Sequence, residues 1–372
     1  MNTEEILQLK VRLLTEGARI PEGEWKGRRG GAGPVGGRYF FLPNGRICGV
    51  PIRTGKQADL FRSASLEPTN NPKVWLYDGS TELSEVPRPK FYDMKTANGI
   101  PYSSIALLHG ERTLATTVYQ ACRYWTQGSQ CKFCTIPLSH RVGDTVLEKT
   151  PEDVAEVVLA ALNDDYIDDV LLTTGTPDSP DMGIEKLINT ITAIRKVSNI
   201  PIAVQFEPPV ATSVIKQVAE AGANAVGIHI ESADEPIREE MCPGKYEYGS
   251  LDLYKQSWKF ALKYFEKGHV STFILHGLGE DVQKTLNLAE ELSRIGVMPI
   301  VAPVRPSQGS QLADYIPTYV GNLSSSVAFY KSLGTILFKH GLNPKETKGG
   351  CHKCGGCTPI QEAYDWAAAQ KL

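Results

Sequence analysis

From about residue 113 to residue 341, the chain alternates short apolar runs with amphipathic segments. Repeated β-α-β connections of this kind are right-handed and produce a parallel sheet. The six units predict a partial (β/α)6 barrel of the TIM type, with an open doubly wound sheet as the alternative. The runs expected to be strands are 113–121, 168–176, 201–208, 225–232, 270–280 and 297–306.

Within each expected strand, successive side chains point to opposite faces of the sheet. The face assigned to the lumen starts with small residues such as Ala203 and Ala225 and ends with polar residues. Barrel enzymes carry their chemistry at the C-terminal ends of the strands. The expected cofactor or substrate contacts at this rim are Gln205, Glu207, His229, Glu231 and His276.

Three cysteines, Cys122, Cys131 and Cys134, follow the first expected strand with the spacing C-x8-C-x2-C. Three thiolates can hold three irons of a [4Fe–4S] cluster, whereas a structural cluster has four cysteine ligands. The fourth iron would stay open, as a catalytic metal requires. The alternatives are a zinc knuckle or a fortuitous trio.

A second triad, Cys351, Cys354 and Cys357, lies in the segment KGGCHKCGGCTP. Its compact spacing predicts either an auxiliary [4Fe–4S] cluster or a zinc site that recruits His352. A disordered tail is the third possibility. The single cysteines Cys48 and Cys242 are expected to be buried thiols.

The composition limits the remaining possibilities. The 372 residues suffice for one large α/β domain and a smaller appendage. We expect an N-terminal β-rich accessory region at 1–110, the barrel at 111–341, and a C-terminal cysteine-rich metal-binding extension at 342–372. No apolar run approaches the roughly 20 residues of a membrane span, and the N-terminus has no signal-peptide core. Closely grouped cysteines are typical of metal sites in a reducing cytoplasm.

The N-terminal region carries hairpin signals. RYFFLPNGRICGVPI reads as two strands around Pro-Asn-Gly, and WLYDGSTEL adds a further strand and turn. The glycine-rich stretch at 27–45 lacks the Gly-Lys-Ser/Thr ending of a phosphate-binding loop, so we expect a flexible loop before the hairpin.

The first cysteine triad resembles the cluster loop of radical S-adenosylmethionine (SAM) enzymes, whose common motif is C-x3-C-x2-C. Phe133 precedes the last cysteine, as in that motif. Eight residues separate the first two cysteines here, whereas three separate them in the common motif. The resemblance covers about residues 113–341 and is closest to biotin-synthase-like members. The C-terminal GCHKCGGCTP also resembles an uncharacterised radical SAM subfamily encoded beside nitrilases.

The resemblance implies roles for individual residues. TTGT at 173–176 resembles the segment whose backbone contacts the SAM amino group, Glu231 matches a polar SAM contact, and Arg238 and Lys245 match basic residues near the SAM carboxylate. The SAM contacts expected from strand position and resemblance together are Phe133, Thr174, Gly175, Thr176, Glu207, Glu231, Arg238 and Lys245. His229 and His276 are expected to act on the substrate.

The resemblance also implies an activity. We expect reductive cleavage of SAM at the cluster to a 5′-deoxyadenosyl radical, which takes hydrogen from a small-molecule substrate, with a flavodoxin or ferredoxin-type reductant. The alternatives are a non-catalytic iron–sulfur or zinc-binding scaffold and an RNA-modifying radical SAM enzyme. A net charge of −3 gives no general attraction to nucleic acid, which disfavours the latter.

Overall fold

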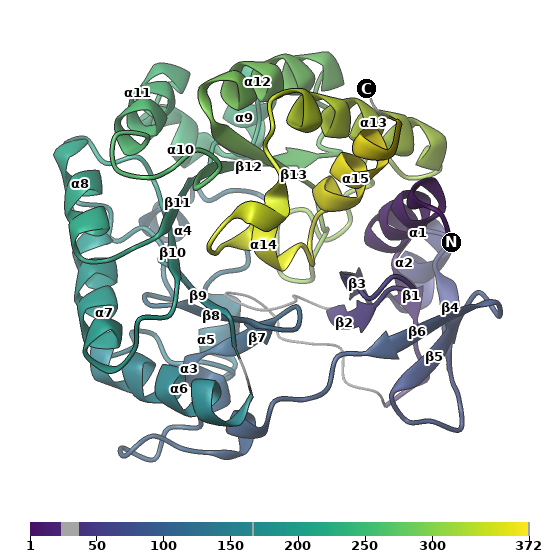
Figure 1. Cartoon of the computed structure of the whole chain (residues 1–372), viewed down its shortest axis with the longest axis horizontal. Coiled ribbons are helices and arrows are strands. Elements are labelled where there is room, and N and C mark those ends of the chain that lie inside the picture. The colour runs from purple at the N-terminus through teal and green to yellow at the C-terminus, as the bar shows by residue number, and fades with distance from the viewer. Residues whose placement is uncertain (24–36, 166, 371–372) are drawn as a thin grey trace.

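The computed structural model describes residues 1–23, 37–165 and 167–370. Two sheets lie beside each other, a curled one with helices outside it and a smaller N-terminal one (Figure 1). Most of the glycine-rich stretch singled out above lies outside the described residues. No helix in the described part of the chain is long and apolar enough to cross a membrane.

The larger sheet has the order β13-β12-β11-β10-β9-β8-β7. Strands β8 to β13 are parallel, and β7 pairs antiparallel with β8 at the edge. The partial barrel predicted from the sequence is therefore confirmed. Its strands are β7 Leu107–His109, β8 Thr113–Thr117, β9 Asp169–Thr173, β10 Ile202–Phe206, β11 Ala225–Ile228, β12 Val270–His276 and β13 Val297–Pro303.

Six longer helices cover the outside of this sheet (Figure 1). In the first of them, the hydroxyl of Thr150 accepts the backbone N–H of Asp153, and Pro151 occupies the first turn. Both features favour a helix start at this position. The six helices are α6 Pro151–Asp164, α7 Ile184–Val197, α8 Ser213–Glu220, α11 Leu251–Ala261, α12 Val282–Ile295 and α13 Leu323–Lys339.

The two faces of the barrel strands differ as their alternation requires. Val204, Val226 and Ile228 face the helices within the main apolar core. On the other face, a separate small cluster joins side chains of four adjacent strands, and Cys351 of the C-terminal segment packs against it. That cluster consists of Ala115, Leu171, Ala203 and Ala225. Small side chains thus leave space in the lumen, and the C-terminal segment enters it.

The N-terminal sheet has the order β1-β4-β5-β6-β2-β3 and packs against α1 Thr3–Glu16. The hairpins predicted around Pro-Asn-Gly and in WLYDGSTEL are both present. The strands are β1 Ala18–Arg19, β2 Gly37–Phe41, β3 Ile47–Pro51, β4 Ala64–Pro68, β5 Val74–Tyr77 and β6 Thr81–Glu85.

The segment between β6 and β8 belongs to the barrel rather than to the N-terminal sheet. Phe91, Tyr102, Ile105 and Leu108 lie in the main barrel core, and β7 extends the barrel sheet. The sequence suggested a boundary at residue 110, whereas the N-terminal sheet itself ends with β6. Two short helices of this part of the chain, η1 Lys90–Asp93 and α3 Tyr102–Ile105, lie between β6 and β7, and α2 Gly55–Leu60 precedes β4.

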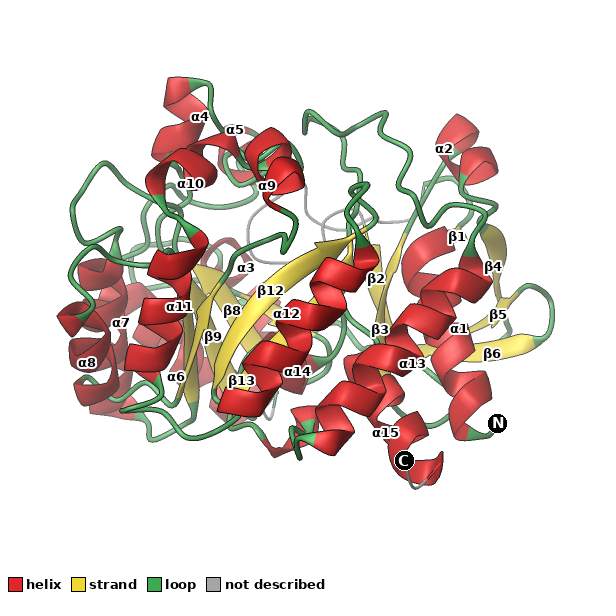
Figure 2. Cartoon of the chain, turned by 90° about the horizontal axis from the view of Figure 1, so that it is seen from above, coloured by secondary structure: helices red, strands yellow, loops and turns green. Residues whose placement is uncertain are grey.

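The remaining short helices lie at the two ends of the barrel. Figure 2 shows α4, α5, α9 and α10 beyond one end of the strands and α14 toward the other. The C-terminal α15 packs on α13 and α1, where a buried ion pair joins Lys10 to Glu362 at 2.9 Å. These helices are α4 Arg123–Gln127, α5 Leu138–Arg141, α9 Glu235–Met241, α10 Pro243–Tyr248, η2 Pro344–Glu346, α14 Cys351–Cys354 and α15 Ile360–Gln370.

Candidate active site

The first cysteine loop lies at the C-terminal rim of the barrel. Cys131, Phe133 and Cys134 share an apolar cluster with residues of other rim loops, including Met241 and Leu312. The backbone of Lys132 donates to the carbonyl of Met241 at 2.8 Å and accepts from the N–H of Leu312 at 3.2 Å. Segments distant in sequence therefore hold the cysteine loop in a fixed place.

The TTGT segment packs directly against the start of the cysteine loop. A Cβ at Gly175 would overlap the carbonyl oxygen of Ala121, so only glycine fits there. The N–H of Gly175 donates to the carbonyl of Tyr119 at 2.8 Å, and the carbonyl of Thr176 accepts from Arg123 at 2.7 Å. The Thr174 hydroxyl donates a hydrogen bond to the Gly175 carbonyl oxygen at 2.8 Å. The end of β9 thus positions Cys122 through backbone contacts.

The surroundings of the three thiols suit metal ligands. Burial raises the pKa of Cys122, and the backbone N–H groups of Thr176 and Tyr124 act in the opposite direction. Burial raises the pKa of Cys134 to about 12. A thiol binds metal as the thiolate, so a bound metal would supply the positive charge that these buried groups require. Three thiols are the donor set that three irons of a cluster would need, although no three side chains in the described part of the chain are arranged to hold a single metal ion.

Cys242 adjoins this loop, which the sequence did not indicate. A hydrogen bond to the Cys242 side chain is the first cause, and burial the second, that hold the pKa of Cys131 well above its usual value. Both thiols are buried in the same rim cluster. A single cysteine more than a hundred residues away carries no spacing signal, so only the fold reveals this neighbour.

Glu231 and Lys245 form an ion pair beside the cysteine loop. Their Oε1 and Nζ atoms are 2.7 Å apart, and Nζ lies 4.0 Å from Oε1 of Glu207. Burial by itself would lower the pKa of Lys245, but Glu231 and the Cys131 thiol raise it well above its usual value. Glu231 also has a φ of 70° in the left-handed region, although it is not a glycine. Such strain is concentrated at functional sites.

Glu207 and His229 face the lumen below the rim. The Tyr124 hydroxyl donates to Oε2 of Glu207 at 3.1 Å. Nδ1 of His229 accepts the backbone N–H of Phe273 at 3.0 Å, so the neutral ring carries its proton on Nε2. Burial lowers the pKa of His229 to about 4. The ring is therefore a neutral hydrogen-bond donor at pH 7, and Nε2 has no partner among the described residues.

Comparison with known proteins identifies the family. The sequence profile described as the radical SAM superfamily matches residues 127–292, which include Cys131, Cys134 and the Glu231–Lys245 pair. The chain contains a radical SAM domain at these residues. It is therefore an enzyme of the radical SAM class, and the family implies a [4Fe–4S] cluster and SAM.

Individual relatives of this radical SAM enzyme are distant. Bacteriochlorophyllide c C-7(1)-hydroxylase of Chlorobaculum limnaeum is 22% identical over 83% of this chain and 80% of its own length. Among solved structures, methylornithine synthase (PylB) is 18% identical with a TM-score of 0.48, covering 62% of this chain and 64% of that one. The hydrogenase maturase HydG of Carboxydothermus hydrogenoformans is 15% identical with a TM-score of 0.46, covering 63% and 53%. The chain thus spans less than two thirds of those two structures.

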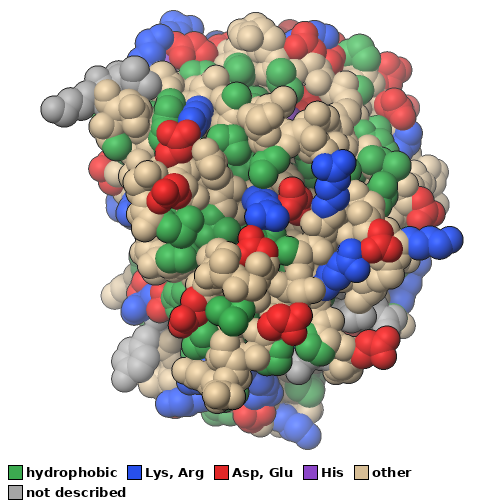
Figure 3. Space-filling view, turned by 90° about the vertical axis from the view of Figure 1, so that its right-hand side faces the viewer, with side chains coloured by type: hydrophobic (Ala, Val, Ile, Leu, Met, Phe, Trp, Pro, Cys, Tyr) green, Lys and Arg blue, Asp and Glu red, His purple; other side chains and the backbone are tan. Residues whose placement is uncertain are grey.

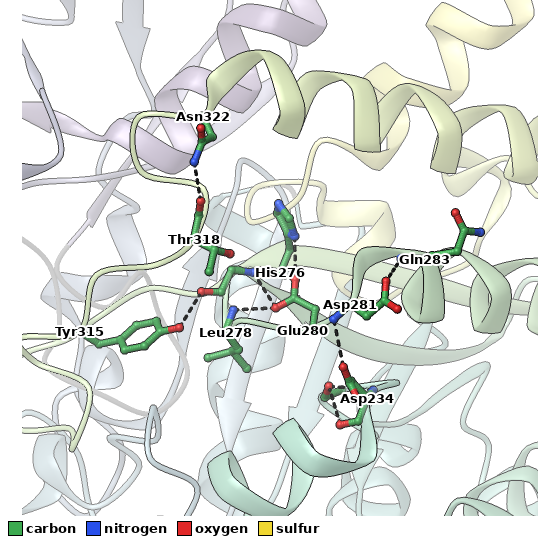
Figure 4. Close-up of polar contacts among 11 residues, drawn as sticks. Asp234, His276, Leu278, Glu280, Asp281, Gln283, Tyr315, Thr318 and Asn322 are labelled. Carbon is green, nitrogen blue, oxygen red and sulfur yellow. Dashed lines mark hydrogen bonds and ion pairs between the residues drawn. The ribbon is translucent and has the colours of Figure 1, made fainter.

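His276 does not lie where the sequence placed it in this radical SAM barrel. Its ring stacks on Phe329 of α13 with centroids 4.6 Å apart, and Nδ1 lies 2.8 Å from Oε1 of Glu280 (Figure 4). Phe273, by contrast, lies 5.3 Å from the His229 ring. The faces of β12 are therefore the reverse of those predicted, because the apolar Phe273 points into the lumen and the polar His276 toward the helices.

Arg238 also differs from the prediction. Its Nη2 donates to the backbone carbonyls of Lys245, at 3.3 Å, and Gly249. The guanidinium lies over the rings of Tyr246 and Tyr254, with Arg Cζ 5.4 and 5.1 Å from their centroids. Arg238 thus joins α9, α10 and α11 from a buried position, while its Nε and Nη1 have no hydrogen-bond partner among the described residues. Arg123, directly after Cys122, lies over Tyr248 at the rim and was not predicted.

The second triad lies at the opposite end of the lumen. Nε2 of Gln205 donates to Sγ of Cys351 at 3.1 Å. The N–H of Gly350 donates to the carboxylate of Asp169 at 3.1 Å, and Asp169 lies at the start of β9. Burial raises the pKa of Asp169 to about 6 and that of Cys351 to about 12. Cys351 thus packs inside the barrel, and all three cysteines are half-buried rather than exposed on a tail.

His352 has one ring nitrogen, Nδ1, that is buried without a hydrogen-bond partner among the described residues. Its Nε2 lies 3.1 Å from the carbonyl oxygen of Gly268. Across the described residues, no three His, Cys, Asp or Glu side chains are arranged to hold a single metal ion. A cluster differs from a single ion in that each cysteine binds a separate iron.

Proposed function

We propose that this enzyme cleaves SAM reductively at a [4Fe–4S] cluster held by Cys122, Cys131 and Cys134, and removes hydrogen from a small-molecule substrate. When bound, the cluster and SAM supply a carbon-centred radical able to abstract hydrogen. The arrangement of polar side chains in the lumen supports this proposal best. Its polar side chains, Gln205 and His229, lie between the rim cysteines and the enclosed Cys351.

The rim residues are assigned to SAM. Lys245 provides a buried positive charge suited to the SAM carboxylate, and Glu231 provides an acceptor for hydroxyl or amino groups. The backbone of Thr174, Gly175 and Thr176 lies against the cysteine loop. Phe133 and Glu207 complete this set, with Phe133 packed beside Cys131 and Glu207 bonded to Tyr124. Arg238 is left out because its charge is directed to backbone carbonyls.

The lumen residues are assigned to the substrate. The Nε2–H of neutral His229 is a donor without a partner among the described residues, so it suits an acceptor group on a small molecule. His276 is not assigned to the substrate, because it packs against α13. Positive and negative side chains are interspersed on the face shown in Figure 3, which gives that face no extended basic surface for nucleic acid.

The C-terminal triad is assigned a second [4Fe–4S] cluster rather than zinc. The three cysteines lie in one turn, and His352, directly beside Cys351 in the chain, is poorly placed to chelate the same zinc ion as that cysteine. Electrons for both clusters would come from a flavodoxin or ferredoxin-type reductant, which fits a reducing compartment such as the cytoplasm.

The test is anaerobic reconstitution with iron and sulfide, followed by dithionite and SAM. We expect 5′-deoxyadenosine to form and to acquire deuterium from a labelled substrate. Candidate metabolites can be screened as deuterated pools, with deuterium in 5′-deoxyadenosine as the signal. Cys131→Ala should abolish the product, whereas Cys48→Ala, in the core of the N-terminal sheet, should retain it. Formation of 5′-deoxyadenosine by Cys131→Ala would refute the assignment.

A further inference from the structure

The hydroxyl of Tyr39 is buried without a hydrogen-bond partner among the described residues. Tyr39 lies on β2 of the N-terminal sheet, and only 8% of its surface is exposed. An unmade hydrogen bond of this kind lowers the stability of the fold. A water, an ion or another group outside the chain can supply the missing partner.

The partner must lie near the second cysteine triad. Gly356 lies between two cysteines of the triad, and a Cβ at Gly356 would lie 3.3 Å from Cδ1 of Tyr39 and 3.6 Å from Sγ of Cys354. The Tyr39 ring and the Cys354 sulfur therefore face the same small space.

Glycines on three segments allow the sheet to approach the triad this closely. A Cβ at Gly49, opposite Tyr39 in the β2–β3 ladder, would lie 3.0 Å from Cε1 of Tyr39. A Cβ at Gly356, between Cys354 and Cys357, would lie 2.6 Å from the same atom. A Cβ at Gly110 would lie 3.1 Å from Sγ of Cys354. The Tyr39 ring and the Cys354 sulfur thus occupy space that side chains would fill.

Backbone hydrogen bonds fix this contact. The N–H of Gly49 donates to the carbonyl of Gly356 at 2.7 Å, which ties β3 to the cysteine turn. Nη2 of Arg305, just beyond β13, donates to the carbonyl of Gly49 at 2.7 Å. Cys48 points to the other face of the hairpin, into the core of the N-terminal sheet. Tyr39 and Ile47 are on the face of the hairpin that meets the triad, and of these two side chains Tyr39 is the one that carries a hydrogen-bond donor.

We propose that the Tyr39 hydroxyl donates a hydrogen bond to sulfur of the iron–sulfur group held by Cys351, Cys354 and Cys357. This inference rests on the proposed second cluster. The N-terminal sheet would then complete a site built by the C-terminal segment inside the barrel. Hydrogen bonds to sulfur stabilise the reduced, more negative cluster and raise its reduction potential.

The test uses the full chain with Cys122, Cys131 and Cys134 changed to Ala, so that iron at the second triad is observed alone. In this background, Tyr39→Phe should keep the iron content, lower the midpoint potential, and remove one solvent-exchangeable proton coupling from the hyperfine spectrum of the reduced cluster. Tyr77→Phe is the matched control, because Tyr77 is also a buried hydroxyl without a partner in the described chain but lies in the sheet core. It should leave the potential and the coupling unchanged.

A second variant guards against misfolding of Tyr39→Phe. Site-specific replacement of Tyr39 by 3-fluorotyrosine keeps the ring and makes the hydroxyl a stronger donor, so the potential should rise. An unchanged potential and proton coupling in both variants would overturn the proposal. Loss of iron in Tyr39→Phe, with the fold retained, would make Tyr39 a ligand and also overturn it. Absence of iron in the triple-Ala protein itself would refute the second cluster, and the hydrogen bond with it, while leaving SAM cleavage by the unsubstituted enzyme as a separate result.

Discussion

The Nε2 atom of Gln205 lies 3.1 Å from Sγ of Cys351, although 146 positions separate the two residues. Gln205 is on β10, and Glu207, which contacts Tyr124 of the cysteine loop, follows directly after the end of the same strand. One strand therefore runs from the second cysteine triad to the first. A group in the lumen between them can contact both ends of the barrel.

The two triads should load iron independently. Reconstituted enzyme is expected to hold roughly eight irons per chain, from two four-iron clusters. Changing Cys351, Cys354 and Cys357 to Ala should leave about four and preserve uncoupled SAM cleavage. Elemental analysis measures the iron content, and electron paramagnetic resonance detects the reduced clusters. One zinc per chain and no iron in the variant with Cys122, Cys131 and Cys134 removed would contradict the second cluster.

Glu231 and Lys245 should govern SAM affinity. Removing a charge-assisted contact costs about 1.5–3 kcal/mol, so Glu231→Gln and Lys245→Met are expected to weaken SAM binding roughly tenfold or more. Calorimetric titration under anaerobic conditions gives the dissociation constants. Arg238→Met is the comparison, because its guanidinium contacts backbone carbonyls, and it should lower stability more than affinity. If Arg238→Met instead weakens SAM binding more than it lowers stability, Arg238 belongs to the SAM site.

The left-handed backbone at Glu231 permits a separate measurement. Glycine adopts this conformation without strain, whereas a residue held there costs of order 1–3 kcal/mol. Glu231→Gly should therefore unfold no more easily than Glu231→Ala, and by denaturant titration it should be the more stable of the two. Both should bind SAM weakly. A less stable glycine variant would show that the backbone is not strained.

His276 should contribute to stability and not to turnover. It stacks on Phe329 and pairs with Glu280, whose carboxylate also accepts the N–H groups of Gly277 and Leu278. Removing one partner of a buried pair is strongly destabilising, by about 3–5 kcal/mol. His276→Asn should lower the unfolding midpoint while the folded fraction retains 5′-deoxyadenosine formation. Loss of turnover without loss of stability would place His276 in the site.

His229 should make stability depend on pH. Its pKa is about 4 in the folded protein, against an ordinary value of 6.5. Below pH 6.5 the unfolded chain gains a proton that the folded protein does not, so stability falls from pH 6.5 to about 4 and is constant above. The full difference corresponds to about 3 kcal/mol. His229→Gln should flatten this part of the stability profile, and the imidazole nitrogen chemical shifts should report a neutral ring at pH 6.

The sequence predicted those features that local periodicity determines. The six parallel strands, the helix starting at Pro151 and the hairpin between β2 and β3 all follow from residues close in the chain. The predicted face of β12 was wrong because each face of this strand carries both apolar and polar residues, so its sequence does not show which side is the lumen. Contacts such as Tyr39 with Cys354 depend on packing across hundreds of residues, and no local pattern encodes them.

Placing the second triad inside the lumen has a consequence for biosynthesis. The segment from η2 to α15 follows the barrel in the chain, so the ribosome completes the strands before this segment can enter their lower end. Until then, Ala203 and Leu171 are not covered by Cys351. A metal group bound as proposed would therefore reach Cys351 most easily before this segment enters the lumen, whereas Cys354 lines a surface pocket and stays accessible.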